Sequence, residues 1–322
     1  MNSINHYREE FLAHLKTSIA VKEPRNLYEP IDYILQLGGK RLRPVLTLIA
    51  ADLFGGDYRK ALPAAAAVEV FHNFSLVHDD IMDNASLRRG KATVHQKWNS
   101  NIAILSGDAM LICAYRLLES YPPDTFAALA KLFSKTALEV CEGQQWDMDF
   151  ETQTQVSIPQ YLQMIRYKTA VLVGAALQMG TIIAGASIEN QRLIYDFGVT
   201  IGLAFQLQDD YLDTFGDEAF GKKIGGDILE NKKTILYLKT LALADEAQRN
   251  TLIAQYTTSE ESDEKIAIVT QLFRQTGAAE AVRDEITRTT DEALNLLEHI
   301  TISDENRAYL KQFALELMNR KV

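Results

Sequence analysis

The chain has 322 residues, of which 47% are hydrophobic, and only 7 Pro and 17 Gly, so it can bury a large core and is neither fibrous nor disordered. Its formal charge of −10 argues against binding to nucleic acid or to an anionic membrane surface, since both call for basic patches. An anionic substrate must therefore meet a local reversal of charge.

Apolar residues recur at helical spacing in residues 11–19, 62–77 and 294–300, whereas alternating, strand-like runs are hard to find. The first sixteen residues carry charges where a secretory signal needs an apolar core, so we expect a cytoplasmic protein. No Pro/Gly/Ser-rich linker divides the chain. The pattern predicts an all-α bundle that forms one domain over residues 1–322.

Proline and glycine mark the expected helix boundaries. Prolines expected in first turns are Pro30, Pro63 and Pro159, and glycine pairs expected at breaks are Gly38-Gly39, Gly55-Gly56 and Gly225-Gly226. The longest apolar stretch, residues 171–186, is shorter than the ~18 residues of a membrane span, so it predicts a core helix and no integral span. Cys113 and Cys141 lack metal-like spacing and are expected to be small buried side chains.

One acidic pattern occurs twice, as SLVHDDIMD and FQLQDDYLD. Residues i and i+4 share a helix face, so Asp79 with Asp83, and Asp209 with Asp213, each project two carboxylates in one direction. A single copy in an acidic protein is typical of a solvated surface. Two copies indicate a common function.

Carboxylate ligands without Cys or His suit Mg²⁺, with Mn²⁺ as a possible substitute. Because Mg²⁺ is commonly held by one or two carboxylates together with substrate phosphates, two facing acidic clusters would hold ions around a phosphate group. The remaining phosphate charge needs cations. Basic clusters interleaved with the acidic motifs lie at residues 40–43, 88–91, 222–223 and 232–233.

The motifs GGKRLRP, LVHDDIMDNASLRRG, the Lys168-Thr169 pair, FQLQDDYLD and GKKIGGDILENKKT, in this order, resemble the trans-isoprenyl diphosphate synthases, also called polyprenyl synthetases. The resemblance implies a single-domain helical bundle of the isoprenoid synthase type with a central active-site cavity, and a homodimer. It also implies a reaction in which an allylic diphosphate ionises with the help of Mg²⁺, condenses with isopentenyl diphosphate and loses a proton.

The resemblance implies a role for each matching residue. The implied metal ligands are Asp79, Asp83 and Asp209, supported by Asp80, Asp210 and Asp213. The implied contacts to isopentenyl diphosphate are Lys40, Arg43, His72 and Arg89. The residues implied around the allylic diphosphate are Arg88, Lys168, Thr169, Gln206, Lys223 and Lys232. Without the resemblance, His72 would be interpreted as a core histidine, and Tyr161 is interpreted as packing.

Residues before the first motif bear on product length. In the family, aromatic residues at the positions five and four before the motif are typical of farnesyl synthases. Small residues at these two positions are typical of long-chain synthases. This chain has Phe74 and Ser75, a mixture that favours geranylgeranyl diphosphate as the product, with farnesyl or longer polyprenyl diphosphates as alternatives. The alternative role for Phe74 is core packing, with Leu111 or Tyr115 deeper in the bundle limiting the product.

Two other functions stay open. A class I terpene cyclase would typically replace the second DDxxD and need not retain Lys40 and Arg43, and a non-catalytic synthase subunit would tend to lose one acidic motif. In this chain both acidic motifs are intact, and Lys40 and Arg43 are present. One long apolar helix between Leu105 and Val140 is expected to supply the dimer interface.

Overall fold

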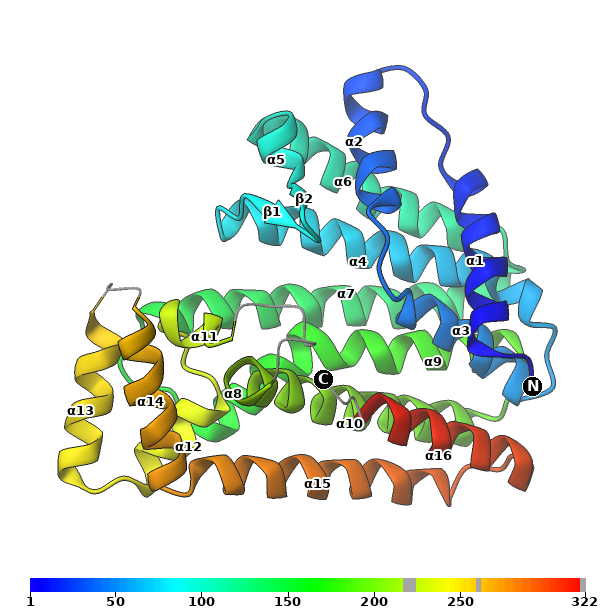
Figure 1. Cartoon of the computed structure of the whole chain (residues 1–322). Helices are drawn as coiled ribbons and strands as arrows, with labels where there is room; N and C mark the ends of the chain where they lie inside the picture. The colour runs from blue at the N-terminus through cyan, green and yellow to red at the C-terminus, as the bar shows by residue number, and fades with distance from the viewer. Residues whose placement is uncertain (217–223, 259–261, 319–322) are drawn as a thin grey trace. The chain divides into compact units, whose positions relative to one another are not determined.

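A computed structural model describes residues 1–216, 224–258 and 262–318, which form helices and one two-stranded hairpin (Figure 1). The chain divides into two compact units. Unit 1 comprises Met1–Ala137 and Ala175–Tyr195, and unit 2 comprises Leu138–Gly174 and Asp196–Val322. The predicted all-α class is confirmed.

Unit 1 contains the N-terminal elements. They are α1 (Ile4–Ser18), α2 (Arg25–Gln36), α3 (Leu42–Leu53), the 3-10 helix η1 (Tyr58–Ala61), α4 (Leu62–Met82), β1 (Leu87–Arg88), β2 (Lys91–Ala92), α5 (Val94–Lys97) and α6 (Ser100–Leu118). Three helices contribute residues to both units: α7 (Pro123–Thr152), α9 (Val171–Ile183) and α10 (Ile188–Phe215). The axis of unit 1 is α4, which packs along α6 and against α3 (Figure 1).

The sequence of α4 explains this central place. Pro63 lies in its first turn, where a missing N–H costs nothing. Residues 64–67 are four alanines with no exposed surface, and their small side chains let neighbouring helices approach closely. Gly107 of α6 continues this close contact, because a Cβ atom there would lie 2.3 Å from Nε2 of His78.

Unit 2 contains the C-terminal elements. They are α8 (Ile158–Ile165), the π-helix η2 (Arg166–Ala170), α11 (Gly226–Leu229), α12 (Ile235–Leu243), α13 (Glu246–Thr257), α14 (Asp263–Gln275), α15 (Ala278–Leu297) and α16 (Asp304–Met318). Its core joins several of these helices through buried apolar side chains, including Met164, Leu207, Leu236, Phe273 and Val282.

Most predicted helix boundaries are confirmed. Pro63 and Pro159 stand in the first turns of α4 and α8. Gly38-Gly39 and Gly55-Gly56 lie between elements, and Gly225-Gly226 stands at the start of α11. The prediction for Pro30 is wrong, because α2 begins at Arg25, directly after Pro24, and Pro30 lies inside it. The prediction for the cysteines is also wrong, since Cys113 is only half-buried and Cys141 is exposed; both are free thiols.

The apolar stretch at residues 171–186 forms mostly buried helix, as predicted. Within the described ranges, α6 is long and apolar enough to cross a membrane, a test that core helices of soluble proteins also pass. The stretch from Leu105 to Val140 contains most of α6, a long apolar helix as expected, and the first part of α7, which begins at Pro123. Its role as a dimer interface stays a prediction. On α6, Leu105 and Ile112 are 60% and 59% exposed.

Candidate active site

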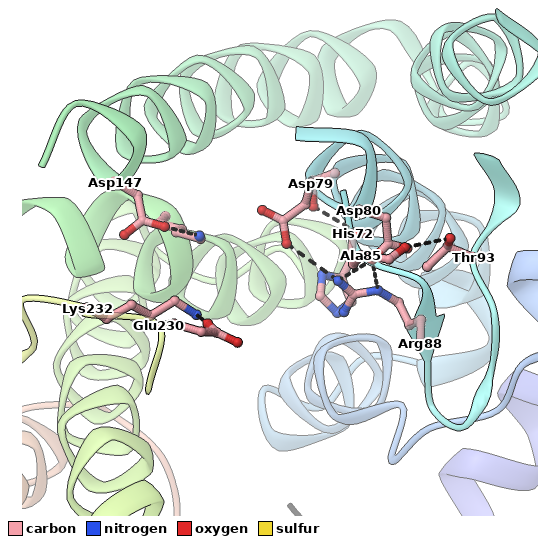
Figure 2. A network of polar contacts seen from close by, with 11 residues as sticks. His72, Asp79, Asp80, Ala85, Arg88, Thr93, Asp147, Glu230 and Lys232 are labelled. Atoms are coloured by element: carbon pink, nitrogen blue, oxygen red, sulfur yellow. Dashed lines mark hydrogen bonds and ion pairs between the residues drawn. The ribbon is translucent and has the colours of Figure 1, made fainter. Parts of the chain in front are cut away.

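The first acidic motif lies at the C-terminal end of α4. The backbone N–H of Asp83 donates to the carbonyl of Asp79, so the helical turn continues through the motif and these two residues share a face, as predicted. Asp80 points away from this face and is buried. Arg88 holds it, donating from Nε to Oδ1 of Asp80 over 2.7 Å and lying 3.5 Å from Oδ2 of Asp79 (Figure 2).

Burial raises the pKa of the Asp80 carboxyl, although Arg88 acts in the opposite direction. Three carboxylates at the negative end of a helix dipole repel one another and the helix itself. Moreover, the buried Oδ2 of Asp80 has no hydrogen-bond partner among the described residues. The motif therefore has an excess of negative charge that a cation would relieve.

Arg88 and Arg89 belong to the tight hairpin β1–β2. Arg88 pairs with Lys91 across the hairpin, and the two residues between them, Arg89 and Gly90, have φ angles of 53° and 72°. Two-residue turns of type I′ require positive φ at both positions. The turn directs Arg89 to the loop after α2, where its Nη1 donates to the carbonyl of Gly38.

The GGKRLRP segment, which runs into α3, places its three cations differently. Lys40 is exposed, and Nη1 of Arg43 lies 3.2 Å from Nε2 of His72. Arg41 is buried and pairs instead with Glu69 and the carbonyl of Leu35. Of these three cations, Lys40 and Arg43 therefore remain as candidates for a substrate phosphate.

His72 lies among these cations. Burial lowers its pKa well below the ordinary value, and the charges of Arg43, Arg89, Arg88 and Arg41 lower it further. The imidazole is therefore neutral at pH 7. The structure thus brings together, within unit 1, the predicted phosphate contacts Arg43, His72 and Arg89.

The second acidic motif lies near the C-terminal end of α10, so it shares the unfavourable dipole position of the first. Asp209 is half-buried, whereas Asp210 and Asp213 are buried. Oδ2 of Asp213 accepts the backbone N–H of Asp227 over 3.0 Å, and its carbonyl accepts the N–H of Gly225. Asp213 thereby fixes the start of α11.

Asp210 has a strongly perturbed carboxyl. Burial and the charge of Asp227 raise its pKa to about 8, against hydrogen bonds from Tyr161 and Gln206. The hydroxyl of Tyr161 donates to Oδ2 of Asp210, and Gln206 donates to Oδ1 over 3.1 Å. The interpretation of Tyr161 as mere packing is wrong, because it is a hydrogen-bond partner of the motif.

Lys168 and Thr169 lie in the π-helix η2. Nζ of Lys168 donates to Asp147 of α7 over 2.5 Å, and Oγ1 of Thr169 donates to Oε1 of Gln206 over 3.4 Å. Thr169, Gln206, Asp210 and Tyr161 thus form one hydrogen-bonded chain. Sequence reasoning missed Asp147, whose spacing of four residues from Gly143 carries no recognisable signal.

The two lysines after α11 have different surroundings. Nζ of Lys232 lies 2.6 Å from Glu230 and 3.8 Å from Asp227 (Figure 2). Burial acts to lower the pKa of Lys232, but these carboxylates raise it. Lys233 instead donates to the carbonyls of Phe150 and Glu151, where it caps the end of α7. The candidate Lys223 lies outside the described residues.

The donor set fits Mg²⁺. Each motif offers carboxylate oxygens at a helix C-terminus with no Cys or His among them, which is the chemistry that hard cations prefer. In the described part of the chain, no three His, Cys, Asp or Glu side chains converge on one point. A site of this kind takes its remaining ligands from water and substrate phosphates.

Known proteins are similar to this chain in sequence and in fold. The pattern of the polyprenyl synthetase family matches residues 24–273. A short chain isoprenyl diphosphate synthase from Methanothermobacter thermautotrophicus is 36% identical over 321 residues, 98% of each chain. A solved geranylgeranyl pyrophosphate synthase is 54% identical, with a TM-score of 0.96 and full coverage of both chains.

A further solved structure contains ligands. It is a geranylgeranyl pyrophosphate synthase from Corynebacterium glutamicum complexed with isoprenyl diphosphate and magnesium, 29% identical, with a TM-score of 0.86 and 98% coverage of each chain. The family match spans most of the chain and includes both acidic motifs. The chain therefore belongs to the polyprenyl synthetase family and is a trans-prenyltransferase with the isoprenoid synthase fold.

Proposed function

We propose that this protein condenses isopentenyl diphosphate with an allylic diphosphate and releases geranylgeranyl diphosphate. The observation that carries the proposal is the cationic cluster of Arg43, Arg89 and neutral His72 in the same unit as the carboxylates of the first motif. Similarity to geranylgeranyl pyrophosphate synthases supports the choice of product.

The isopentenyl substrate must keep its diphosphate. A cationic pocket without metal suits this requirement, because guanidinium groups bind phosphate oxygens through paired hydrogen bonds without promoting ionisation as a Lewis acid would. Lys40, Arg43 and Arg89 supply the positive charge. His72 contributes a neutral ring nitrogen held by Arg43.

The allylic substrate must lose its diphosphate. Bound Mg²⁺ supplies Lewis-acid stabilisation of the charge that develops on this leaving group. The first motif would bind metal through Asp79 and Asp83, supported by Asp80. The second motif would bind metal through Asp209, supported by Asp210 and Asp213. Protein cations add to this effect: Arg88, Lys168, Lys223 and Lys232. One preorganised donor of this kind is worth about 2.7–4 kcal/mol in the transition state.

Thr169 and Gln206 would stabilise the carbocation with their oxygen dipoles. Since the hydroxyl of Thr169 donates its proton to Gln206, the lone pairs of Oγ1 are left as a negative dipole for a developing cation. We propose that this whole machinery forms one functional domain over residues 1–322, since the family match continues through both units. We also propose a cytoplasmic homodimer.

The test is incubation with Mg²⁺, radiolabelled isopentenyl diphosphate and a series of allylic primers, followed by chromatography of the dephosphorylated products. Geranylgeraniol is the expected main product. Farnesol or a longer alcohol would replace the product assignment, a cyclic hydrocarbon would indicate a cyclase, and no consumption would indicate a non-catalytic subunit. Asp79→Ala and Asp209→Ala should each lower turnover about a hundredfold or more, with the helical circular dichroism signal intact.

A further inference from the structure

Lys168 and Thr169 lie in a π-helical turn. The backbone N–H of Val171 bonds to the carbonyl of Arg166, five residues back, whereas the bonds of an α-helix span four. The turn lies between α8 and α9 and so widens the helical path by one residue at this point. π-Helical turns are rare and frequently occur at functional sites.

One side of this turn contacts α7 without an intervening side chain. A Cβ atom at Gly143 would lie 2.2 Å from the backbone nitrogen of Lys168 and 2.7 Å from its Cα atom. One helical turn later, Asp147 accepts a hydrogen bond from the ammonium group of Lys168. Between them, the ring of Trp146 stacks on Tyr167 with centroids 5.4 Å apart and planes 23° apart. Helix α7 therefore holds both the main chain and the side chain of Lys168.

The other side contacts α10 in the same manner. A Cβ atom at Gly202 would lie 3.1 Å from the Cα atom of Ala170 and 3.2 Å from its Cβ atom. Four residues after Gly202, the side chain of Gln206 accepts a hydrogen bond from the hydroxyl of Thr169. Each flanking helix thus places a glycine against the backbone of the turn and, on the same face, a polar side chain against a side chain of the turn.

We propose that Gly143 and Gly202 are positioning residues that set where Lys168 and Thr169 act. Glycine is the least favourable residue in a helix interior after proline, so helix formation does not account for these two positions. Close approach of another backbone does. The inference rests on the proposed function, because Lys168 and Thr169 are assigned there to the allylic diphosphate and the carbocation.

The two glycines differ in how much displacement a methyl group would force. Ordinary contacts of a Cβ atom lie at 3.4–4 Å, so an added methyl at Gly143 must move the turn by about an ångström, since neither neighbour is a flexible side chain. At Gly202 a shift of a few tenths of an ångström suffices. Misplacing a catalytic group by about 1 Å costs on the order of a hundredfold in rate.

The experiment compares Gly143→Ala and Gly202→Ala with a matched control, Gly180→Ala. The control creates an equal overlap, 2.2 Å from the carbonyl oxygen of Thr47, in unit 1. We expect Gly143→Ala to lower kcat about a hundredfold with the KM for isopentenyl diphosphate within about twofold of wild type. Gly202→Ala should give a smaller loss of kcat. Gly180→Ala should lower the melting temperature comparably but keep kcat within about threefold of wild type.

Fluorescence gives a readout that a general loss of stability does not change. Trp98 and Trp146 are the two tryptophans of the chain, so Trp98→Phe leaves Trp146 as the reporter of its stack with Tyr167. In this background, Gly143→Ala should shift the emission to longer wavelength as the stack opens, while Gly180→Ala should not.

The inference is overturned if Gly143→Ala lowers kcat no more than Gly180→Ala, or if the Trp146 emission is unchanged. If Gly143→Ala does not fold, Gly202→Ala decides by the same measurements, and wild-type kcat would overturn the inference. Lys168→Ala separates the two levels of the argument. Full activity in Lys168→Ala would refute the proposed role of Lys168 itself, whereas a large loss there with wild-type kcat in Gly143→Ala would refute only the positioning role.

Discussion

At the scale of single residues, burial decides what neighbouring residues of one motif can do. Arg41 and Arg43 are two positions apart, yet Arg41 forms a buried ion pair with Glu69, whereas Arg43 contacts His72. Removing one partner of a buried pair leaves an uncompensated charge, which typically costs about 3–5 kcal/mol. Arg41 therefore supports the loop, and Arg43 is the candidate for substrate.

His72 should make the stability of the protein depend on pH. Burial and the arginine charges hold its pKa below the ordinary 6.5, so the unfolded chain binds more protons than the native protein below that pH. The stabilising contribution is present above pH 6.5 and is lost on acidification. His72→Gln should reduce the decrease in unfolding free energy between pH 7 and pH 5, by at most about 1.4 kcal/mol per pH unit.

Urea unfolding of both proteins at several pH values measures this difference. The comparison also removes the contribution of His14, whose pKa burial lowers as well. Parallel curves of stability against pH for wild type and His72→Gln would contradict the neutral state of this imidazole.

Phe74 should limit product length. Its ring is buried and lies 4.8 Å from the ring of His78 and 5.5 Å from that of Phe71, so Phe74→Ala would leave a space in this aromatic group. We expect a longer main product, with a loss of about 3–5 kcal/mol in stability. Ser75→Phe, which adds bulk at the next position, should shorten the product.

Chromatography of the dephosphorylated products measures both effects. An unchanged distribution in an active Phe74→Ala enzyme would assign Phe74 to packing alone. The limit on chain length would then pass to deeper residues such as Tyr115, whose ring packs edge-on against Phe133 at 4.8 Å.

At the scale of elements, the hairpin β1–β2 is tied to α2 and the loop that follows it. The hydroxyl of Tyr33 donates to the carbonyl of Ala92 over 2.8 Å, and the ammonium of Lys97 lies 3.7 Å from the centre of the Tyr33 ring. Arg89 adds the bond to Gly38. These contacts hold Arg89 of the hairpin next to the GGKRLRP segment, which carries Lys40 and Arg43, within unit 1.

Gly39 should be necessary for this arrangement. Its φ angle of 116° disfavours other residues, and a Cβ atom there would lie 2.9 Å from the guanidinium carbon of Arg89. Gly39→Ala should therefore displace Arg89 and raise the KM for isopentenyl diphosphate about tenfold, since charge-assisted bonds of this kind are worth about 1.5–3 kcal/mol. Steady-state kinetics with varied isopentenyl diphosphate measures it.

Gly55→Ala is the matched control. Gly55 also has a positive φ, of 76°, but nothing lies within 4 Å of an added Cβ atom. This variant should lose stability without a change in KM. If both variants raised KM equally, backbone strain rather than contact with Arg89 would be responsible.

At the scale of the whole molecule, metal and substrate should stabilise the protein together. Protein-bound Mg²⁺ commonly takes its remaining ligands from substrate phosphates, so we expect an allylic diphosphate to contribute to metal binding. Mg²⁺ with an allylic diphosphate should raise the melting temperature more than Mg²⁺ alone, and a chelator should abolish turnover. Equal stabilisation by Mg²⁺ without substrate would contradict this dependence.

The exposed apolar side of α6 should be covered in a two-fold dimer. Light scattering should give about twice the chain mass of 36.2 kDa at micromolar concentration. Leu105→Lys combined with Ile112→Lys should shift the mass to that of one chain, because the charges would be buried without partners. A monomeric wild-type protein would refute the dimer, and binding of that monomer to lipid vesicles would assign the apolar side to a membrane.

The sequence by itself determined the features that depend on local spacing. Helical periodicity predicts the all-α class, and i, i+4 spacing places Asp79 and Asp83 on one face of α4. Motif order identifies the family. These predictions hold because a helix relates residues within a few positions, whatever the rest of the chain does.

Only the tertiary structure decided which members of each motif are buried and what they contact. Arg41 with Glu69, Tyr161 with Asp210, and Arg89 with Gly38 are separated by 28, 49 and 51 residues. No periodicity connects such distant positions, because their contact depends on how whole helices pack. The same packing places Gly143 against Lys168, and thus decides where this lysine lies.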